Sequence, residues 1–228
     1  MIKGLQKTSL VDFPHTLSCT VFFGGCNFRC GYCYNSSLVV SPAKTPSIPE
    51  GEILSFLKER KKYLDGVCIT GGEPTLYKDL EVFCQKIKSL GYKIKLDTNG
   101  SNPAVLKELF SKNMLDYVAM DIKSSLESYS LVADVPVDIN AIKESVELIK
   151  NSGVEYEFRT TVVPDIINEK EILEIGVLLN GAKKFFLQQF RPSKTTISKK
   201  YYEMQPLSAE KLGAFKEILS KYVKDVGI

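Results

Sequence analysis

Six β-rich runs alternate along this chain with segments whose apolar residues recur at helical spacing, and this alternation limits the folds open to it. The expected strands cover residues 17–23, 67–70, 92–98, 116–121, 154–163 and 183–190. The expected helices lie around residues 53–57, 80–90, 105–109, 142–149, 172–179 and 207–223. A repeated strand and helix order argues for a parallel sheet with right-handed crossovers. The pattern predicts an α/β protein, either an open doubly wound sheet or a partial barrel.

The length and composition are those of an ordinary globular chain. The 228 residues suffice for one large domain or two small ones. No internal repeat is visible, and the only Ser/Pro-rich loop covers residues 36–49, so we expect a single domain over residues 1–228. No apolar run approaches the roughly 18 residues of a membrane span, and the start of the chain lacks a signal peptide's apolar segment. These features predict a cytoplasmic protein with no membrane partner, and a net charge of only +3 does not indicate nucleic-acid binding.

Three cysteines crowd into the stretch FFGGCNFRCGYCYN, at Cys26, Cys30 and Cys33. A structural zinc site usually needs four ligands, and the chain's only histidine, His15, lies in a turn-like stretch. An iron-sulfur cluster held by three thiolates leaves one iron open to bind a small molecule. Both kinds of site remain open on the cysteines alone. The other three cysteines lie among apolar residues and are expected to be buried structural thiols: Cys19, Cys68 and Cys84.

Unusual residues follow every predicted strand. The cysteine loop follows the first strand, and the later strands end in or carry TGGEP (70–74), DTNG (97–100), MDIK (120–123), Arg159 and QQFRP (188–192). Ligands of parallel α/β folds bind at the carboxyl ends of the strands. These segments are therefore predicted to form one site.

The loop CNFRCGYC resembles the cluster-binding motif of the radical S-adenosylmethionine enzymes, with Cys26, Cys30 and Cys33 in the three ligand positions. GGEP at residues 71–74 and the strand order are similar to the same superfamily, and the resemblance covers nearly the whole chain. It implies a partial (β/α)6 barrel of parallel strands with the site at the C-terminal strand ends. It also implies one 4Fe-4S cluster with three cysteine ligands, and S-adenosylmethionine bound at the open iron.

The resemblance implies roles for four positions around the methionyl part of S-adenosylmethionine. Gly71 and Gly72 would let the backbone approach the ligand, and Glu73 would accept a hydrogen bond from the ligand's ammonium group. Arg159 would bind the ligand's carboxylate through its planar guanidinium. The structural alternatives are a tight turn before a helix for the GGEP segment and a surface ion pair for Arg159.

Further positions are assigned in the same way. Asp121 and Lys123 are similar to a family Asp-Lys pair near the ribose, the alternative being an ion pair at the barrel rim. Asp97 and Asn99 lie in DTNG, which lines the cavity in relatives and in some holds a monovalent cation. Gln188 stands where some relatives place a ribose-binding histidine, which leaves its role open.

Residues 7–35 resemble the activating proteins of anaerobic ribonucleoside-triphosphate reductase. The resemblance implies reductive cleavage of S-adenosylmethionine to methionine and a 5′-deoxyadenosyl radical, which abstracts hydrogen from a glycine of the reductase and leaves a glycyl radical. The implied partners are that glycyl-radical enzyme and an electron donor of the flavodoxin or ferredoxin type. Two residues depart from the family pattern: Tyr34 replaces a common histidine, and His15 replaces a glycine.

Three other functions stay open at this stage. Two share the chemistry: an activase of a pyruvate formate-lyase-like enzyme, and a radical enzyme that acts on a small molecule. The third is a non-catalytic module in which the cysteines hold a structural metal ion.

Overall fold

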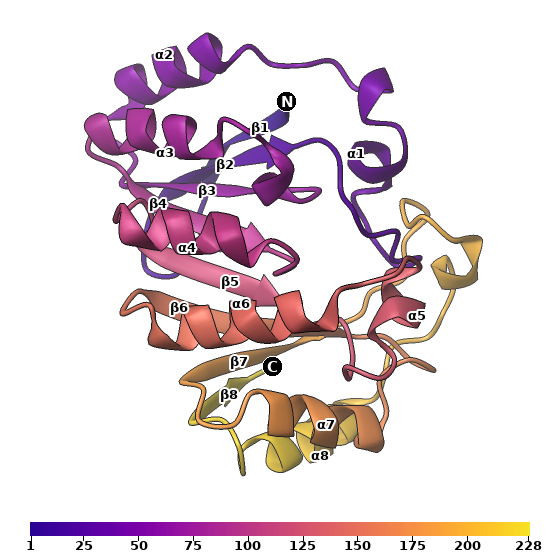
Figure 1. Ribbon diagram of the computed structural model, residues 1–228. Coiled ribbons are helices and arrows are strands. Elements are labelled where there is room, and N and C mark those ends of the chain that lie inside the picture. Colours follow the sequence, from indigo (N-terminus) through magenta and orange to yellow (C-terminus); the bar gives the residue numbers. More distant parts are fainter.

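A computed structural model describes residues 1–228 and contains one eight-stranded sheet, with the strands in chain order from β1 to β8. The strands are β1 (Ile2–Ser9), β2 (Ser18–Phe23), β3 (Gly66–Gly71), β4 (Lys93–Thr98), β5 (Tyr117–Asp121), β6 (Glu155–Val162), β7 (Lys184–Gln189) and β8 (Asp225–Gly227). Strands β2 to β8 are parallel, and β1 pairs antiparallel with β2. The sheet curves, so the protein is a partial barrel of parallel strands, as predicted (Figure 1).

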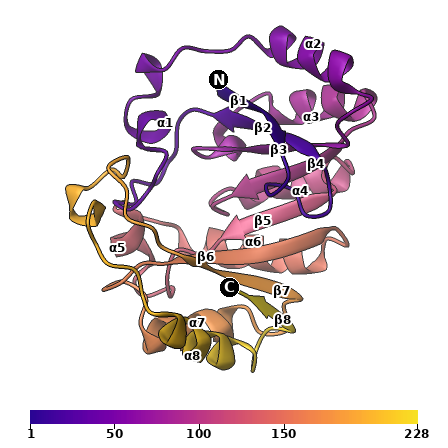
Figure 2. The same ribbon diagram turned by 180° about the vertical axis from the view of Figure 1, so that it is seen from behind.

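The longer helices follow the parallel strands and lie on one face of the sheet, as the two opposite views show (Figure 1, Figure 2). The α-helices are α1 (Ser36–Val40), α2 (Glu50–Arg60), α3 (Leu80–Ser89), α4 (Pro103–Ser111), α5 (Tyr129–Ala133), α6 (Ile139–Asn151), α7 (Glu169–Leu178) and α8 (Ala209–Leu219). Three short 3-10 helices are η1 (Pro42–Lys44), η2 (Pro74–Leu76) and η3 (Lys199–Tyr201). No helix is both long enough and apolar enough to pass through a membrane.

The six predicted strands are all present, but the sheet has two more. Strand β1 was missed because only its ends are buried, so it lacks the alternation of a half-buried strand. Strand β8 was missed because it is only three residues long. Both strands lie at the edges of the sheet, outside the repeating strand and helix units.

The core lies between the sheet and the helices as one cluster of 49 buried residues. Three glycines close helical segments with positive φ, as expected from their positions: Gly91 (81°), Gly153 (76°) and Gly181 (80°). Cys19, Cys68 and Cys84 are buried in this framework, which confirms the sequence prediction for them. The framework leaves the carboxyl ends of the strands free to build a site.

Candidate active site

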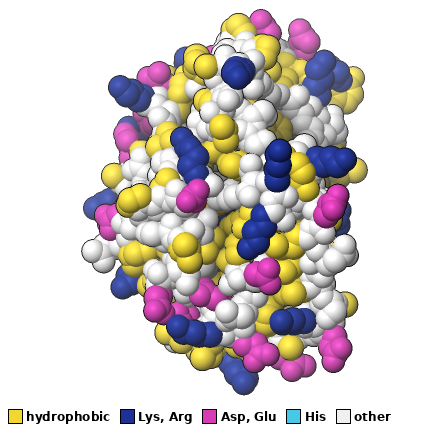
Figure 3. Space-filling view, turned by 90° about the vertical axis from the view of Figure 1, so that its right-hand side faces the viewer, with side chains coloured by type: hydrophobic (Ala, Val, Ile, Leu, Met, Phe, Trp, Pro, Cys, Tyr) yellow, Lys and Arg dark blue, Asp and Glu magenta, His cyan; other side chains and the backbone are white.

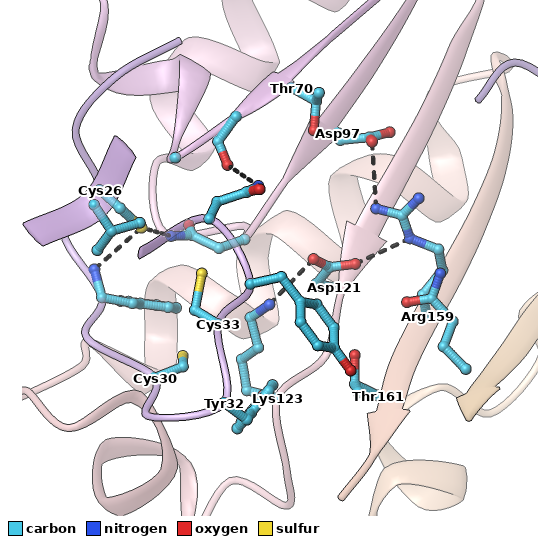
Figure 4. Close-up of a pocket in the computed structure, with 18 of the residues that line it drawn as sticks. Cys26, Cys30, Tyr32, Cys33, Thr70, Asp97, Asp121, Lys123, Arg159 and Thr161 are labelled. Atoms are coloured by element: carbon cyan, nitrogen blue, oxygen red, sulfur yellow. Dashed lines mark hydrogen bonds and ion pairs between the residues drawn. The ribbon is translucent and has the colours of Figure 1, made fainter. Parts of the chain in front are cut away.

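A cavity of about 580 Å³ opens at the carboxyl ends of the parallel strands. It is lined by 21 residues that come from the cysteine loop, from α1, and from strands β3 to β7 or the loops after them. The three thiols stand on one side, Asp97 and Arg159 on the other, and Asp121 and Lys123 between them (Figure 4). The structure thus brings together segments that are more than 150 residues apart in sequence.

The three loop cysteines all line this cavity as free thiols. Burial raises the pKa of Cys26 to about 11, and a hydrogen bond from the Phe28 N–H opposes the shift. Burial also raises the pKa values of Cys30 and Cys33, with the nearby Lys123 ammonium acting in the opposite direction. The thiols are therefore protonated at neutral pH in the metal-free protein, and binding iron must release protons from them.

The cysteine loop is held in place by three segments outside the repeating units. Gly25 N–H donates to the Leu38 carbonyl of α1, and Arg29 N–H donates to the Ala133 carbonyl of α5, each at 2.8 Å. The Gly31 carbonyl accepts from the N–H of Ser198, just before η3, at 2.8 Å. Backbone bonds on three sides fix the loop that carries the thiols. These short segments were not predicted, because each has too few residues to show a periodic pattern.

The glycines of GGEP pack against the start of the cysteine loop. Gly72 N–H donates to the Phe23 carbonyl, and Glu73 N–H donates to the Gly25 carbonyl, each at 2.8 Å. A Cβ atom on Gly71, which has a φ of 125°, would lie 2.3 Å from the Phe23 carbonyl oxygen. Both glycines line the cavity. Their lack of a side chain lets the GGEP turn lie directly against the start of the cysteine loop.

The Glu73 side chain is held by other residues of the protein. Its carboxylate is buried and does not line the cavity. It accepts hydrogen bonds from the Thr75 N–H and hydroxyl, the Thr98 hydroxyl at 2.8 Å and the Asn99 N–H at 2.7 Å. These bonds tie the GGEP turn to the end of β4. In this conformation the carboxylate is turned away from the cavity, and the expected hydrogen bond to a ligand's ammonium group stays a prediction.

Arg159 lies at the centre of a charge network on the inner face of the barrel. Its Nε donates to Asp121 at 2.9 Å, and its Nη2 lies 3.5 Å from Asp97. Asp97 also forms an ion pair with the buried Lys95. Burial would lower the pKa of Arg159, but the surrounding carboxylates outweigh this effect and raise it. Arg159 is thus permanently charged, and it faces the cavity with two carboxylates already beside it.

Asp121 and Lys123 form an ion pair at 3.1 Å, which is the arrangement given above as the alternative to a role near the ribose. Both residues also line the cavity. Burial alone would raise the pKa of Asp121, but Arg159 and Lys123 hold it well below its usual range. Burial disfavours the charged form of Lys123, yet Asp121 keeps its pKa high. The rim therefore carries a fixed anion between two fixed cations.

The remaining predicted residues, Asn99 and Gln188, line the cavity as well. The amide of Asn99 bonds Asn27 at 2.9 Å and lies 3.9 Å from the sulfur of Cys26. The lining residues that were not predicted include Phe28, Asn35, Thr70, Thr161 and Arg191. Thr161 could have been found from sequence, since it lies two positions after Arg159 on one strand and so faces the same way.

Tyr34 bridges the cysteine loop to the far rim of the barrel. Its hydroxyl accepts from the N–H of Arg191 and donates to the carbonyl of Arg191, each at 2.8 Å. Its ring stacks on Phe190 with an interplanar angle of 16°. Tyr34 therefore connects the segments after β2 and β7 across the cavity mouth.

The three free thiols are the site's suitable donors for iron, because thiolates are the usual ligands of iron-sulfur clusters. No three His, Cys, Asp or Glu side chains lie close enough together to hold a single metal ion. The donor set, three sulfurs beside a cavity lined by fixed charges, fits a cluster together with a polar ligand.

The Radical SAM superfamily signature matches residues 20–179, and the chain belongs to this superfamily. The protein is therefore a radical S-adenosylmethionine enzyme, which overturns the alternative of a structural metal-binding module. The family implies a 4Fe-4S cluster and S-adenosylmethionine.

Particular relatives match over the whole chain. The protein is 30% identical over 234 residues to "Putative glycyl-radical enzyme activating enzyme MJ1227" of Methanocaldococcus jannaschii, covering 100% of this chain and 95% of that protein. It is 26% identical over 238 residues to the pyruvate formate-lyase-activating enzyme of Clostridium pasteurianum, covering 99% and 97%. The crystal structure of Streptococcus suis SuiB bound to precursor peptide SuiA has the same fold, with a TM-score of 0.70 at 13% identity. The alignment covers 92% of this chain, which spans about half the length of SuiB.

Proposed function

We propose that this protein is a glycyl-radical enzyme activating enzyme, and that its substrate is a glycine of anaerobic ribonucleoside-triphosphate reductase. The observation that carries the activase assignment is the end-to-end similarity to two proteins named as activating enzymes. The choice of reductase rests on the resemblance of residues 7–35 to reductase activating proteins. The 26% identity to a pyruvate formate-lyase-activating enzyme favours that partner as the second candidate.

The size of the cavity supports a protein substrate. A volume of about 580 Å³ lies within the range of about 300–1,000 Å³ that pockets for one drug-sized ligand occupy. S-adenosylmethionine is a ligand of that size, so little room remains for a second small molecule. A glycine presented on a loop of a large partner needs little space inside the cavity, and the partner itself would exclude water from the mouth.

We assign the cluster to Cys26, Cys30 and Cys33. S-adenosylmethionine would lie among the other predicted residues that line the cavity: Gly71, Gly72, Asp97, Asn99, Asp121, Lys123, Arg159 and Gln188. When bound, the two cofactors supply the reductive cleavage of the sulfonium C–S bond, which yields methionine and a 5′-deoxyadenosyl radical. The protein's own part is to hold the thiols on a rigid loop, to offer Arg159 to a carboxylate, and to shield the site from water.

The charge balance around Arg159 suggests how a carboxylate would be accepted. The guanidinium already contacts Asp97 and Asp121, which leaves its Nη1 atom with one weak partner, Glu157 at 3.8 Å. A ligand carboxylate would therefore share the cation with these residues. Lys95 and Lys123 pair with the same two aspartates and limit the repulsion that the ligand would meet.

The test uses anaerobically reconstituted protein, dithionite, S-adenosylmethionine and a co-encoded reductase. We expect a brown protein with about four irons per chain and a doublet electron-paramagnetic-resonance signal on the reductase. The Cys30→Ala variant should retain no cluster and give no signal, and a reductase in which the target glycine is alanine serves as the substrate control. A signal on a pyruvate formate-lyase-like enzyme but not on the reductase would select the second candidate. Cleavage that requires a small molecule instead would overturn the activase assignment.

A further inference from the structure

The segment between β7 and α8, residues 191–204, carries a net positive charge. This segment contains four of the 30 Lys and Arg residues and one of the 27 Asp and Glu residues. The other 26 basic and 26 acidic residues cancel. The net charge of +3 therefore equals the net charge of this segment.

The basic side chains of this segment, which we name the basic strap, are free for a partner. Arg191, Lys194, Lys199 and Lys200 are all exposed, and none forms an ion pair. Lys86, Lys112 and Lys170, by contrast, each have a carboxylate partner. Several Lys and Arg side chains, with a few Asp and Glu among them, lie on the face where the strands end (Figure 3). An anionic surface could approach the strap without breaking existing pairs.

The basic strap lies directly on the loop that carries the thiols. Ser198 N–H bonds the Gly31 carbonyl, and a Cβ atom on Gly31 would lie 2.9 Å from the Tyr201 ring. Tyr201 also packs edge-on against Tyr32, with 6.1 Å between the ring centroids. Gly31 and Tyr32 are the two residues between Cys30 and Cys33. A partner bound to Lys199 and Lys200 would therefore be separated from the thiols by little more than one layer of side chains.

We propose that the basic strap is the docking site for an acidic electron-transfer protein, which passes one electron to the cluster through the Gly31 and Tyr201 contact. The donor loses this electron and the cluster gains it. The proposal rests on the proposed function, because only a redox cluster held by Cys26, Cys30 and Cys33 needs a donor. Unpaired surface lysines steer association with an anionic protein and raise its rate at low salt.

A donor fits this site better than the substrate protein does. The substrate's glycine has to enter the cavity, whereas Lys199 and Lys200 lie outside the set of residues that line it. An electron needs only a short path, and the strap contacts Gly31, the residue next to Cys30 in sequence. Nucleic acid is the alternative anionic partner for Lys199 and Lys200.

The experiment compares the reconstituted protein with the double variant Lys199→Glu, Lys200→Glu. Isothermal titration calorimetry with oxidised flavodoxin, an acidic flavoprotein, measures binding without any turnover. We expect the variant to bind at least about tenfold more weakly at low salt, and the wild-type affinity to fall as salt is raised to about 0.15 M. Reduction of the cluster by photoreduced flavodoxin should slow by a similar factor, whereas reduction by dithionite should not change.

The matched control is Lys58→Glu, Lys62→Glu, which reverses two exposed lysines at the end of α2 and just beyond it, without ion pairs. Unchanged flavodoxin affinity in the strap variant, or equal losses in both variants, would overturn the proposal. So would a strap variant that keeps flavodoxin binding but loses affinity for the reductase or for single-stranded DNA. If wild-type protein and dithionite form no 5′-deoxyadenosine, the proposed function fails, and the binding measurement still reports on the strap.

Discussion

Gly72 lies so close to Gly25 that a Cβ atom on Gly72 would stand 2.0 Å from the Gly25 carbonyl oxygen. The atom in the way belongs to the backbone, so it cannot swing aside as a side chain could. We therefore expect Gly72→Ala to push the GGEP turn away from the cysteine loop and to break the bond from Glu73 N–H to Gly25. Overpacking of this kind should lower the free energy of unfolding by at least about 2 kcal/mol, measured by urea denaturation of the metal-free protein.

The control for this prediction is Gly51→Ala in the first turn of α2. A Cβ atom there would meet nothing within 4 Å. Alanine should leave stability unchanged or raise it by up to about 1 kcal/mol, because it favours the helix and restricts the unfolded chain. Equal stability of the two variants would show that the loops separate easily and that the contact is not needed.

Glu73→Gln tests the finding that this carboxylate joins two loops. Four donors converge on its two oxygens, from Thr75, Thr98 and Asn99. Glutamine has one oxygen, so its amide nitrogen must face at least one of these donors. We expect a loss of about 1–3 kcal/mol in the free energy of unfolding, because a buried donor is left without a partner. The exposed Glu59→Gln serves as the control, and a variant as stable as wild type would show that the carboxylate can turn away from these donors.

The sequence predicts the framework of this site better than it predicts the direction of individual side chains. Strands β2 to β7 were located because their residues form buried runs between turn signals, and β2 alone has five buried residues of six. The three cysteines were grouped because their close spacing in sequence needs no tertiary information. Segments without a period, such as α1 and α5, left no signal, although their backbones hold the cysteine loop.

Glu73 shows where prediction from residue type ends. A glutamate after two glycines suits a ligand's ammonium group equally well in any conformation of the turn. Its actual direction is set by Thr98 and Asn99, which come from the next strand and have no marked relation to Glu73 in sequence. The pairing of Asp121 with Arg159 is similar, since it depends on the register between β5 and β6. Such relations appear only when the strands are placed side by side.

The ion pairs of Asp121 predict a specific dependence of stability on pH. Its folded pKa lies below the ordinary value of 3.8, because Arg159 and Lys123 outweigh the effect of burial. A group with a lowered folded pKa contributes stability that is complete above its unfolded pKa and is lost as the pH falls below it. The free energy of unfolding of wild type should therefore exceed that of Asp121→Asn by about 2 kcal/mol at pH 6. This difference should shrink between pH 4.5 and pH 3. Urea denaturation at several pH values measures it, and a difference independent of pH would mean that the charge of Asp121 is not responsible.

Tyr34 offers a test of how the cavity mouth is held together. Tyr34→Phe keeps the ring on Phe190 but removes both hydrogen bonds to the Arg191 backbone. Because the residue is 40% exposed, water can replace part of the lost hydrogen bonding, and we expect a loss of only about 0.5–1.5 kcal/mol in the free energy of unfolding. The local effect should be larger, with faster hydrogen exchange at the amide of Arg191. Tyr77→Phe, which removes one long bond of 3.5 Å to Glu50, is the matched control and should leave that amide unchanged. Unaltered exchange at Arg191 in Tyr34→Phe would mean that the rim after β7 keeps its place without the cysteine loop.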